Sequence, residues 1–374
     1  MLEFKMHTNL VFADTLREFM ENENLGERDF ILTNESLYER RLKALKLPCG
    51  VAFLKSYGKG EPTTAMVDAI RADLPQGLRR IVAIGGGAVM DTAKMLSLHT
   101  SAGKTEALFS LSPGAEKPLR MFDVYAIPAT CGTGSEVTNA CAVELESLHT
   151  KRGLNNDLMF AAKSVLIPEL LIGLPYRFFA TSSMDALIHA VESYLSPRST
   201  PVSRLFSTAA VTMILEGYSY VVEHGPTRWT DRAGEFQLAA TYAGLAFCSA
   251  GCAAVHALSY PLGGSYHIPH GEANQLVFAA VFRKYKEKKP MGALNELEDL
   301  LGRCLEVPAA EALETAFRLF DQLQPRKPLR EYGISDSEFQ GFAESVTAGQ
   351  QRLLSNNYVP LSEEDMVEIY RSIY

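Results

Sequence analysis

The chain has 374 residues, of which 47% are hydrophobic and 21% charged, and its formal net charge at pH 7 is −8. This length is large for a single hydrophobic core and is typical of a soluble protein with two domains. The negative charge argues against nucleic acid or an anionic membrane as the main partner, and no apolar run approaches the roughly 20 residues that span a bilayer.

Short apolar runs alternate with amphipathic segments over residues 1–173. Four runs are typical of buried strands of a parallel sheet with helices between them: 29–34, 51–56, 80–87 and 124–130. The stretch 164–175 is expected to add a last extended piece before a boundary marked by proline. We therefore predict an α/β domain of the nucleotide-binding type at 1–173.

Three consecutive glycines follow the third of these strands, in IVAIGGGAVMDTAK at 81–94. Glycine lets backbone N–H groups approach a phosphate closely, and the N-terminus of the following helix favours an anion. The spacing differs from the dinucleotide fingerprint G-x-G-x-x-G, because Asp91 stands near the place of the third glycine. We expect phosphate binding here, and a tight strand-to-helix turn without a ligand is the alternative.

A second loop of small residues, PATCGTGSEVTN at 128–139, follows the strand at 124–130. Its hydroxyl and N–H groups are suited to wrap a pyrophosphate or a nicotinamide amide. A simpler and compatible interpretation is a helix start that Ser135 caps, with Glu136 in the first turn.

Long helical patterns dominate after residue 173, at 182–195, 203–224, 235–250 and 293–305. We therefore predict an all-helical domain at 174–374.

Asp185 and His189 lie at i and i+4 on one face of the first of these helices, a spacing that also occurs in surface hydrogen bonds. Three of the chain's eight histidines follow within VHALSYPLGGSYHIPHGEAN at 255–274. With His256 and His270, the set becomes one carboxylate and three imidazoles, a plausible ligand shell for a divalent transition metal. We expect the Pro-Leu-Gly-Gly segment at 261–264 to form the turn that lets the imidazoles converge.

The six cysteines are scattered along the chain, which is typical of reduced thiols, and the N-terminus lacks a signal-peptide core. Cys248 and Cys252 lie one helical turn apart, but neither has a second cysteine pair that would complete a metal site. We therefore expect a cytoplasmic protein.

Four motifs occur in the order and spacing of the iron-containing (group III) alcohol dehydrogenases, which the chain resembles over nearly its whole length: GGGAVMDTAK, CGTGSEVT, MDALIHAVESY and VHALSYPLGGSYHIPHGEAN. The resemblance implies a Rossmann-like dinucleotide-binding domain with a parallel sheet at 1–173. It also implies an all-α domain at 174–374 that holds the metal and the substrate. Dehydroquinate synthase and glycerol dehydrogenase share this architecture, but the Asp-x-x-x-His helix and the histidine spacing favour the alcohol dehydrogenase branch.

The resemblance also assigns roles to residues of this chain. It implies that the metal ligands are Asp185, His189, His256 and His270. It implies that NAD(H) is bound by Gly86, Gly87, Asp91, Thr130, Thr133, Ser135 and Lys151, the last near the ribose. The expected metal is Fe²⁺, with Zn²⁺ as the alternative. In two places the chain departs from many members: Asn34 replaces an aspartate that binds the adenine ribose, and Tyr260 replaces a histidine four residues after the third ligand.

Further stretches, DFILTNESLY, FFATSSMDALIHA, RKPLREYGI and GQQRLLSNNYVPLSEED, are most similar to the branch that interconverts 4-hydroxybutyrate and succinate semialdehyde by hydride transfer. The substrate carboxylate needs a cation or several hydrogen-bond donors. His267 and Tyr260 are candidates for that contact and for proton transfer, and Arg326, Lys327 and Arg330 are further candidates for the carboxylate.

The family resemblance implies a homodimer or larger homo-oligomer. The alternatives are an enzyme of the same family for another short-chain alcohol, and a non-catalytic protein that binds metal and nucleotide.

Overall fold

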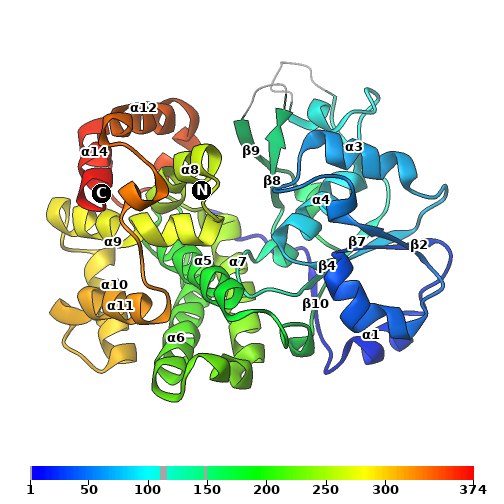
Figure 1. The fold of residues 1–374 in the computed structure, drawn as a ribbon, viewed down its shortest axis with the longest axis horizontal. Helices are drawn as coiled ribbons and strands as arrows, with labels where there is room; N and C mark the ends of the chain where they lie inside the picture. The colour runs from blue at the N-terminus through cyan, green and yellow to red at the C-terminus, as the bar shows by residue number, and fades with distance from the viewer. Residues whose placement is uncertain (1, 110–115, 147–149) are drawn as a thin grey trace. The chain divides into compact units, whose positions relative to one another are not determined.

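A computed structural model describes residues 2–109, 116–146 and 150–374 (Figure 1). The chain divides into one compact unit at Met6–Gly173 and a second at Leu174–Tyr374, which also includes the first residues up to Lys5. The expected first domain contained those residues, so the structure differs there. The Lys5 backbone N–H donates to Ser249 Oγ at 3.0 Å, and the rings of Phe4 and Phe206 stack with centroids 5.8 Å apart.

The first unit is built on a parallel sheet, which confirms the expected fold class. Within the described residues its six strands lie in the order β1 (Asn9–Phe12), β10 (Lys163–Leu166), β7 (Asp123–Pro128), β4 (Arg80–Gly85), β2 (Asp29–Thr33) and β3 (Gly50–Phe53). Each neighbouring pair is parallel. The edge strand β1 was not expected, since its four residues are only partly buried and show no long apolar run.

Side chains alternate between the two faces of the central strands, and helices cover both faces. Leu32 and Ala83 pack with residues of α3 (Thr64–Asp73) and α4 (Gly87–Ser97), while Ile31, Val82 and Ile84 pack with α1 (Leu16–Glu23). This double coverage is why β2 and β4 are buried along their whole length.

Smaller elements complete the unit. Two antiparallel pairs are β5 (Leu98–His99) with β6 (Leu119–Arg120), and β8 (Ala140–Leu145) with β9 (Thr150–Asn155). The short helix α2 (Glu35–Leu37) continues into a π-helical turn at Tyr38–Leu42. Short 3₁₀ turns lie at Lys43–Leu45, Leu54–Ser56, Thr105–Phe109, Ser135–Val137, Asp157–Met159 and Pro168–Leu170.

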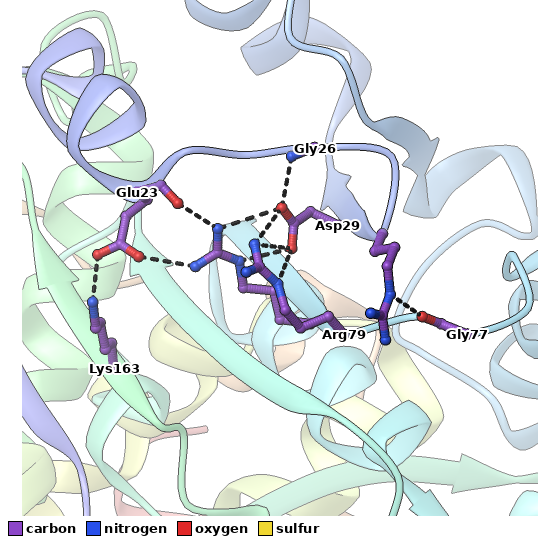
Figure 2. Close-up of polar contacts among 8 residues, drawn as sticks. Glu23, Gly26, Asp29, Gly77, Arg79 and Lys163 are labelled. Atoms are coloured by element: carbon purple, nitrogen blue, oxygen red, sulfur yellow. Dashed lines mark hydrogen bonds and ion pairs between the residues drawn. The ribbon is translucent and has the colours of Figure 1, made fainter.

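An ionic cluster joins the amino ends of three strands to α1 (Figure 2). Asp29 is fully buried and accepts hydrogen bonds from Arg80 Nε at 2.8 Å and from Arg79 Nη2 at 2.9 Å. Arg80 also donates to Glu23 at 2.9 Å, and Glu23 pairs with Lys163. Burial alone would raise the pKa of Asp29, but the hydrogen bonds, led by that from Arg79, lower it below its ordinary value.

The second unit is helical. Its α-helices are α5 (Tyr176–Leu195), α6 (Pro201–His224), α7 (Ala233–Ala250), α8 (Ala254–Tyr266), α9 (His270–Lys288), α10 (Ala293–Leu305), α11 (Ala309–Leu323), α12 (Phe339–Gly349), α13 (Gln351–Leu354) and α14 (Glu363–Ser372). Short 3₁₀ turns lie at Pro226–Arg232, Leu329–Tyr332 and Asp336–Glu338. Helices α6, α7 and α9 pack around α5, and every residue from Ser183 to Leu195 is buried.

Helix α6 has the length and the apolar composition of a membrane span, unlike the expectation that no such run exists. The bent pair Pro226–Ala250 and Ala254–Tyr266 meets the same test together, with an angle of 104° between its parts. Core helices of soluble proteins share this composition, and α6 packs against α5 and α7.

A candidate metal site and a candidate nucleotide-binding edge

The candidate metal site starts from polar residues on the inward faces of α5. Asp185, His189 and Glu192 follow one another at helical spacing, and their exposed fractions are 3%, 5% and 1%. A buried carboxylate or imidazole needs charge or hydrogen-bond partners. The surroundings of this helix therefore have to supply them.

The structure brings the four expected ligands together around one carboxylate oxygen. Asp185 Oδ1 lies 3.5 Å from His256 Nε2, 3.6 Å from His270 Nε2 and 3.9 Å from His189 Nε2. Asp185 and His189 come from α5, His256 from the first turn of α8 and His270 from the first residue of α9.

Charge and burial at this cluster suit a divalent cation. Burial would raise the pKa of Asp185, but the neighbouring imidazoles, His189 first, lower it below its ordinary value. Burial lowers the pKa of His256, yet the carboxylates of Glu192 and Asp185 outweigh this and raise it to about 9. The Nε2 atom of His256 is buried without a hydrogen-bond partner among the described residues. One carboxylate oxygen and three imidazole nitrogens fit Fe²⁺ or Zn²⁺.

Two neighbours hold the ligands in place and were not expected from the sequence. Asn274 lies one turn after His270 on α9 and donates to Asp185 Oδ1 at 2.8 Å. Glu192 lies 2.6 Å from His256 Nδ1. The only sequence signal for Glu192 was its place three residues after His189.

Cys252 lies beside His189 and His256, a position that the spacing of the cysteines in the sequence did not indicate. Its Sγ and the imidazole nitrogens of His189 and His256 lie within 4.8 Å of one another. Burial and then the charge of Glu192 raise the thiol pKa well above its ordinary value. The thiol is therefore protonated near pH 7 unless a metal displaces the proton. With His189 and His256 it forms an alternative ligand set, in which Cys252 takes the place of His270 and Asp185. Cys248, its expected neighbour, is half-buried on α7.

The turn that lets His256 and His270 converge is not where we expected it. Pro261 and the glycines after it lie inside α8, although a proline in a helix interior removes one backbone hydrogen bond. The chain turns instead at His267, which caps α8 in the left-handed conformation with φ 54°. The His267 side chain is exposed, and no hydrogen bond or ring contact joins it to the four ligands within the described residues.

Tyr260 is half-buried one turn after His256, and its ring centroid lies 6.3 Å from that of His270. Burial raises its pKa to about 12, so it is a neutral hydrogen-bond donor near pH 7. The charge of Arg352, on α13, acts on both Tyr260 and Cys252. Arg352 is exposed, and no hydrogen bond or ion pair engages its guanidinium in the part of the chain that the structure describes.

Two of the expected carboxylate contacts have other partners. Arg326 forms two hydrogen bonds with Asp321, at 2.6 and 2.7 Å, and Arg330 donates to the backbone of Tyr374. Lys327 is exposed. The charge of Arg352, by contrast, acts on Tyr260 and Cys252 beside the cluster.

The candidate nucleotide-binding edge lies at the carboxyl ends of β2, β4 and β7, which are neighbours in the sheet. Thr33 pairs with Ile84, and Gly85 with Pro128, so the segments after these strands start side by side. These segments begin with Asn34, Gly86 and Ala129. The chain order reverses between β2 and β4, and ligands of open parallel sheets bind at such a switch point.

The two glycine-containing loops touch. A Cβ atom on Gly87 would lie 2.7 Å from Thr133 Cγ2, whereas one on Gly86 would lie 3.4 Å from Thr130 Cγ2. Gly86 precedes α4 without a side-chain cap in the described structure, so the helix N-terminus is open to an acceptor.

Asp91 and Ser135 join these loops to each other. Ser135 Oγ donates to Asp91 Oδ1 at 2.5 Å, and the Ala142 N–H donates to Asp91 Oδ2 at 2.9 Å. Fully buried Lys94 donates to Ser135 Oγ at 2.8 Å and to Thr138 Oγ1 at 3.1 Å. The expected cap at Ser135 is wrong, because the 3₁₀ turn begins at Ser135 and the residue before it is a left-handed glycine.

Lys151 lies in β9, where its backbone pairs with Glu144. The position of its side chain lies outside the described structure.

Known proteins resemble this chain over most of its length. Residues 9–168 match the model of the iron-containing alcohol dehydrogenases, and residues 179–374 match that of the C-terminal part of the same family. The chain is 46% identical over 371 residues to a 4-hydroxybutyrate dehydrogenase of Clostridium kluyveri, with 99% of each sequence covered. It is 32% identical over 301 residues to a long-chain-alcohol dehydrogenase of Geobacillus thermodenitrificans, with 79% of this chain and 74% of the relative covered.

Solved structures share the fold. An archaeal alcohol dehydrogenase from a Red Sea brine pool has a TM-score of 0.83 at 23% identity, with 100% of both chains covered. A sulfoacetaldehyde reductase from Bifidobacterium kashiwanohense, solved with NAD⁺, has a TM-score of 0.83 at 20% identity, with 100% of this chain and 98% of the other covered. With its two family matches and its full-length relative, the chain belongs to the iron-containing alcohol dehydrogenase family.

Proposed function

We propose that this protein is a metal-dependent oxidoreductase that interconverts 4-hydroxybutyrate and succinate semialdehyde with NAD(H). The observation that carries this proposal is the convergence of Asp185 and three imidazole nitrogens in the helical unit of a chain of this family. The substrate rests on the 46% identity to the Clostridium kluyveri relative over the whole length.

Asp185, His189, His256 and His270 would hold the cation, Fe²⁺ by family and Zn²⁺ as the alternative. The bound ion would supply Lewis-acid polarisation of the aldehyde oxygen. Asp185 contributes a single negative charge to the ligand set, which leaves a divalent ion with net positive charge. Asn274 fixes Asp185 through its hydrogen bond of 2.8 Å, and the ring of Phe247 stacks on His189 with centroids 4.3 Å apart.

Tyr260 and His267 are the proposed proton-transfer residues. The phenol of Tyr260, with its pKa raised to about 12, is neutral near pH 7 and would donate its proton to the alkoxide that forms when the aldehyde is reduced. His267 is exposed at the end of α8, where its imidazole meets solvent.

The nucleotide-binding edge of the first unit is the proposed site of NAD(H). Backbone N–H groups at Gly86, Gly87 and the start of α4 would bind the pyrophosphate. Thr130 and Thr133 would supply hydroxyl groups, and Asn34 would bind the adenine ribose. Asp91 and Ser135 act by fastening the loops together, and Lys151 stays a proposed ribose contact.

The test is NADH oxidation with succinic semialdehyde, compared with butyraldehyde as a neutral substrate, in ferrous-loaded, zinc-loaded and chelated protein. Metal-dependent turnover that favours the semialdehyde supports the proposal. Turnover of butyraldehyde alone would move the substrate to another short-chain alcohol. If neither aldehyde is reduced with NADH or NADPH, a non-catalytic protein that binds metal and nucleotide becomes the better account.

The proposed compartment is the cytoplasm, and the proposed assembly is a homodimer or larger oligomer. The six cysteines are thiols rather than disulfides in the described part of the chain, as a reducing compartment favours.

A further inference from the structure

We propose that Glu192 is the positioning residue of the metal site: it selects the tautomer of His256 that binds metal and fixes the start of α8 against α5. This inference rests on the metal site proposed above. It concerns a residue that touches neither the substrate nor the metal, and that acts through a ligand.

The carboxylate of Glu192 has donors on both oxygens. Oε2 accepts from the Ala253 N–H at 2.9 Å and lies 2.6 Å from His256 Nδ1, and Oε1 accepts from the Val255 N–H at 2.7 Å. The side chain is 1% exposed. An ionised carboxylate only accepts hydrogen bonds, so His256 Nδ1 has to be the donor in this contact.

That proton decides what the other ring nitrogen does. In a neutral imidazole only one nitrogen carries hydrogen, so a protonated Nδ1 leaves a lone pair on Nε2. Nε2 is the atom that lies 3.5 Å from Asp185 Oδ1, and it is buried without a hydrogen-bond partner among the described residues. The opposite tautomer would place N–H where the metal binds.

Glu192 also does the work of a helix cap for α8. The N-cap residue is Ala253, whose side chain cannot accept a hydrogen bond, and the chain bends by 104° between the preceding helical segment and α8. The first N–H groups of a helix need acceptors, and Glu192 supplies them from another helix. Because His256 stands in the first turn, the same carboxylate fixes both the backbone and the ring that carry the ligand atom.

The arrangement makes α5 responsible for two parts of the site. Asp185 supplies a ligand, and Glu192, two turns later, orients a ligand from α8. Hydrogen-bond partners of metal-bound histidines raise ligand basicity, and their loss usually lowers metal affinity about 10–100-fold.

The experiment compares Glu192→Gln with the control Glu298→Gln. Glu298 lies on α10, is 5% exposed and accepts a hydrogen bond from Lys286 at 2.6 Å. Its variant therefore also removes a buried carboxylate from the helical unit. The readouts are the affinity for Zn²⁺ and Co²⁺ by chelator competition, and the visible absorption of the Co²⁺-loaded protein. The amide of glutamine has one acceptor oxygen, so it cannot serve all three donors.

We expect Glu192→Gln to bind both metals about 10–100-fold more weakly and to change the Co²⁺ spectrum, while Glu298→Gln stays within about threefold of wild type. Equal affinity and an unchanged spectrum in Glu192→Gln would overturn the inference. If the wild-type protein itself bound neither metal, the metal site and the proposed function would fail first.

A second measurement on the wild-type protein covers the case in which Glu192→Gln does not fold. In zinc-loaded protein with ¹⁵N-labelled histidine, we expect a slowly exchanging proton on Nδ1 of His256, assigned by its loss in His256→Gln. A proton on Nε2 of that ring, or none on Nδ1, would overturn the inference.

Discussion

Replacing Gly87 with alanine tests the contact between the two loops of the nucleotide-binding edge. The new Cβ atom would lie 2.7 Å from Thr133 Cγ2 and 2.9 Å from Thr133 Oγ1. Carbon atoms in contact lie about 3.5–4.0 Å apart, so the loop would have to move by about 0.8 Å or more. Overpacking of this kind costs about 1–3 kcal/mol.

Part of that cost is expected in cofactor binding, because the displaced loop carries Thr130 and Thr133. We expect the Kd for NADH to rise about tenfold, which corresponds to about 1.4 kcal/mol. The assays are NADH fluorescence titration for binding and urea unfolding for stability. The free energy of unfolding is expected to fall by a smaller amount, since alanine favours the helix over glycine by about 0.8–1.0 kcal/mol.

Gly86→Ala is the matched control. Its Cβ would lie 3.4 Å from Thr130 Cγ2, an ordinary contact, and its backbone φ of −83° is open to alanine. We expect this variant to keep the stability of the wild type and to lose only NADH affinity, because the added methyl group hinders the close approach of the pyrophosphate to the backbone. Unchanged NADH binding and stability in Gly87→Ala, or a larger loss of stability in Gly86→Ala, would refute the described loop contact.

Three further predictions concern other parts of the chain. Asp29→Asn removes one of the two carboxylates that pair with buried Arg80 and leaves Glu23 as the other, so we expect the free energy of unfolding in urea to fall by about 1.5–3 kcal/mol at pH 7. Because the fold lowers the pKa of Asp29, the ionised side chain stabilises the protein fully above the ordinary aspartate pKa of 3.8, and this stabilisation is lost as pH falls through the lowered pKa. A difference in free energy of unfolding between variant and wild type that stays the same in acid would contradict this. Arg352→Ala is expected to raise KM about tenfold for succinic semialdehyde and not for butyraldehyde, because the substrate carboxylate would lose a charged donor. His267→Ala tests the other candidate for this contact, and Arg371→Ala is the surface control. Equal effects of Arg352→Ala on both aldehydes would exclude a contact between Arg352 and the carboxylate. Since the pKa of His256 is raised to about 9 in the metal-free protein, Zn²⁺ has to displace a proton from this histidine when it binds. Calorimetry should therefore find a Zn²⁺ affinity that rises with pH up to about 9, and proton release on binding below that pH. Zn²⁺ binding that does not depend on pH would contradict the ligand assignment.

The parallel sheet could be predicted because buried strands of such sheets are continuous apolar runs. RIVAIG at 80–85 and DFILT at 29–33 are buried on both faces, and hydrophobic pattern alone indicates this. The strand β1 escaped prediction because it lies at the edge, where partial exposure removes the pattern.

The four ligand positions were indicated by residue type and by resemblance, whereas their support depended on tertiary structure. Glu192 and Asn274 stand on buried helix faces, where a polar residue has no local signal for its partner on another helix. Cys252 lies in the bend between α7 and α8, and only that bend brings its thiol beside His189 and His256.

Local residue preference misled the prediction at Pro261–Gly264. These residues are typical of a turn, but the packing of α8 against α9 and α12 keeps them helical and moves the turn to His267. The effect of the Arg352 charge on Tyr260 could not be recognised from the sequence, because 92 positions separate the two residues and the packing of α13 on α8 brings their helices together.

X-ray absorption of the zinc-loaded wild-type protein distinguishes the proposed ligand set of Asp185 and three histidines from the rival set that includes Cys252. We expect only nitrogen and oxygen ligands at about 2.0–2.2 Å, with imidazole scattering from His189, His256 and His270. A sulfur ligand at about 2.3 Å would contradict this expectation and would place Cys252 in the metal site.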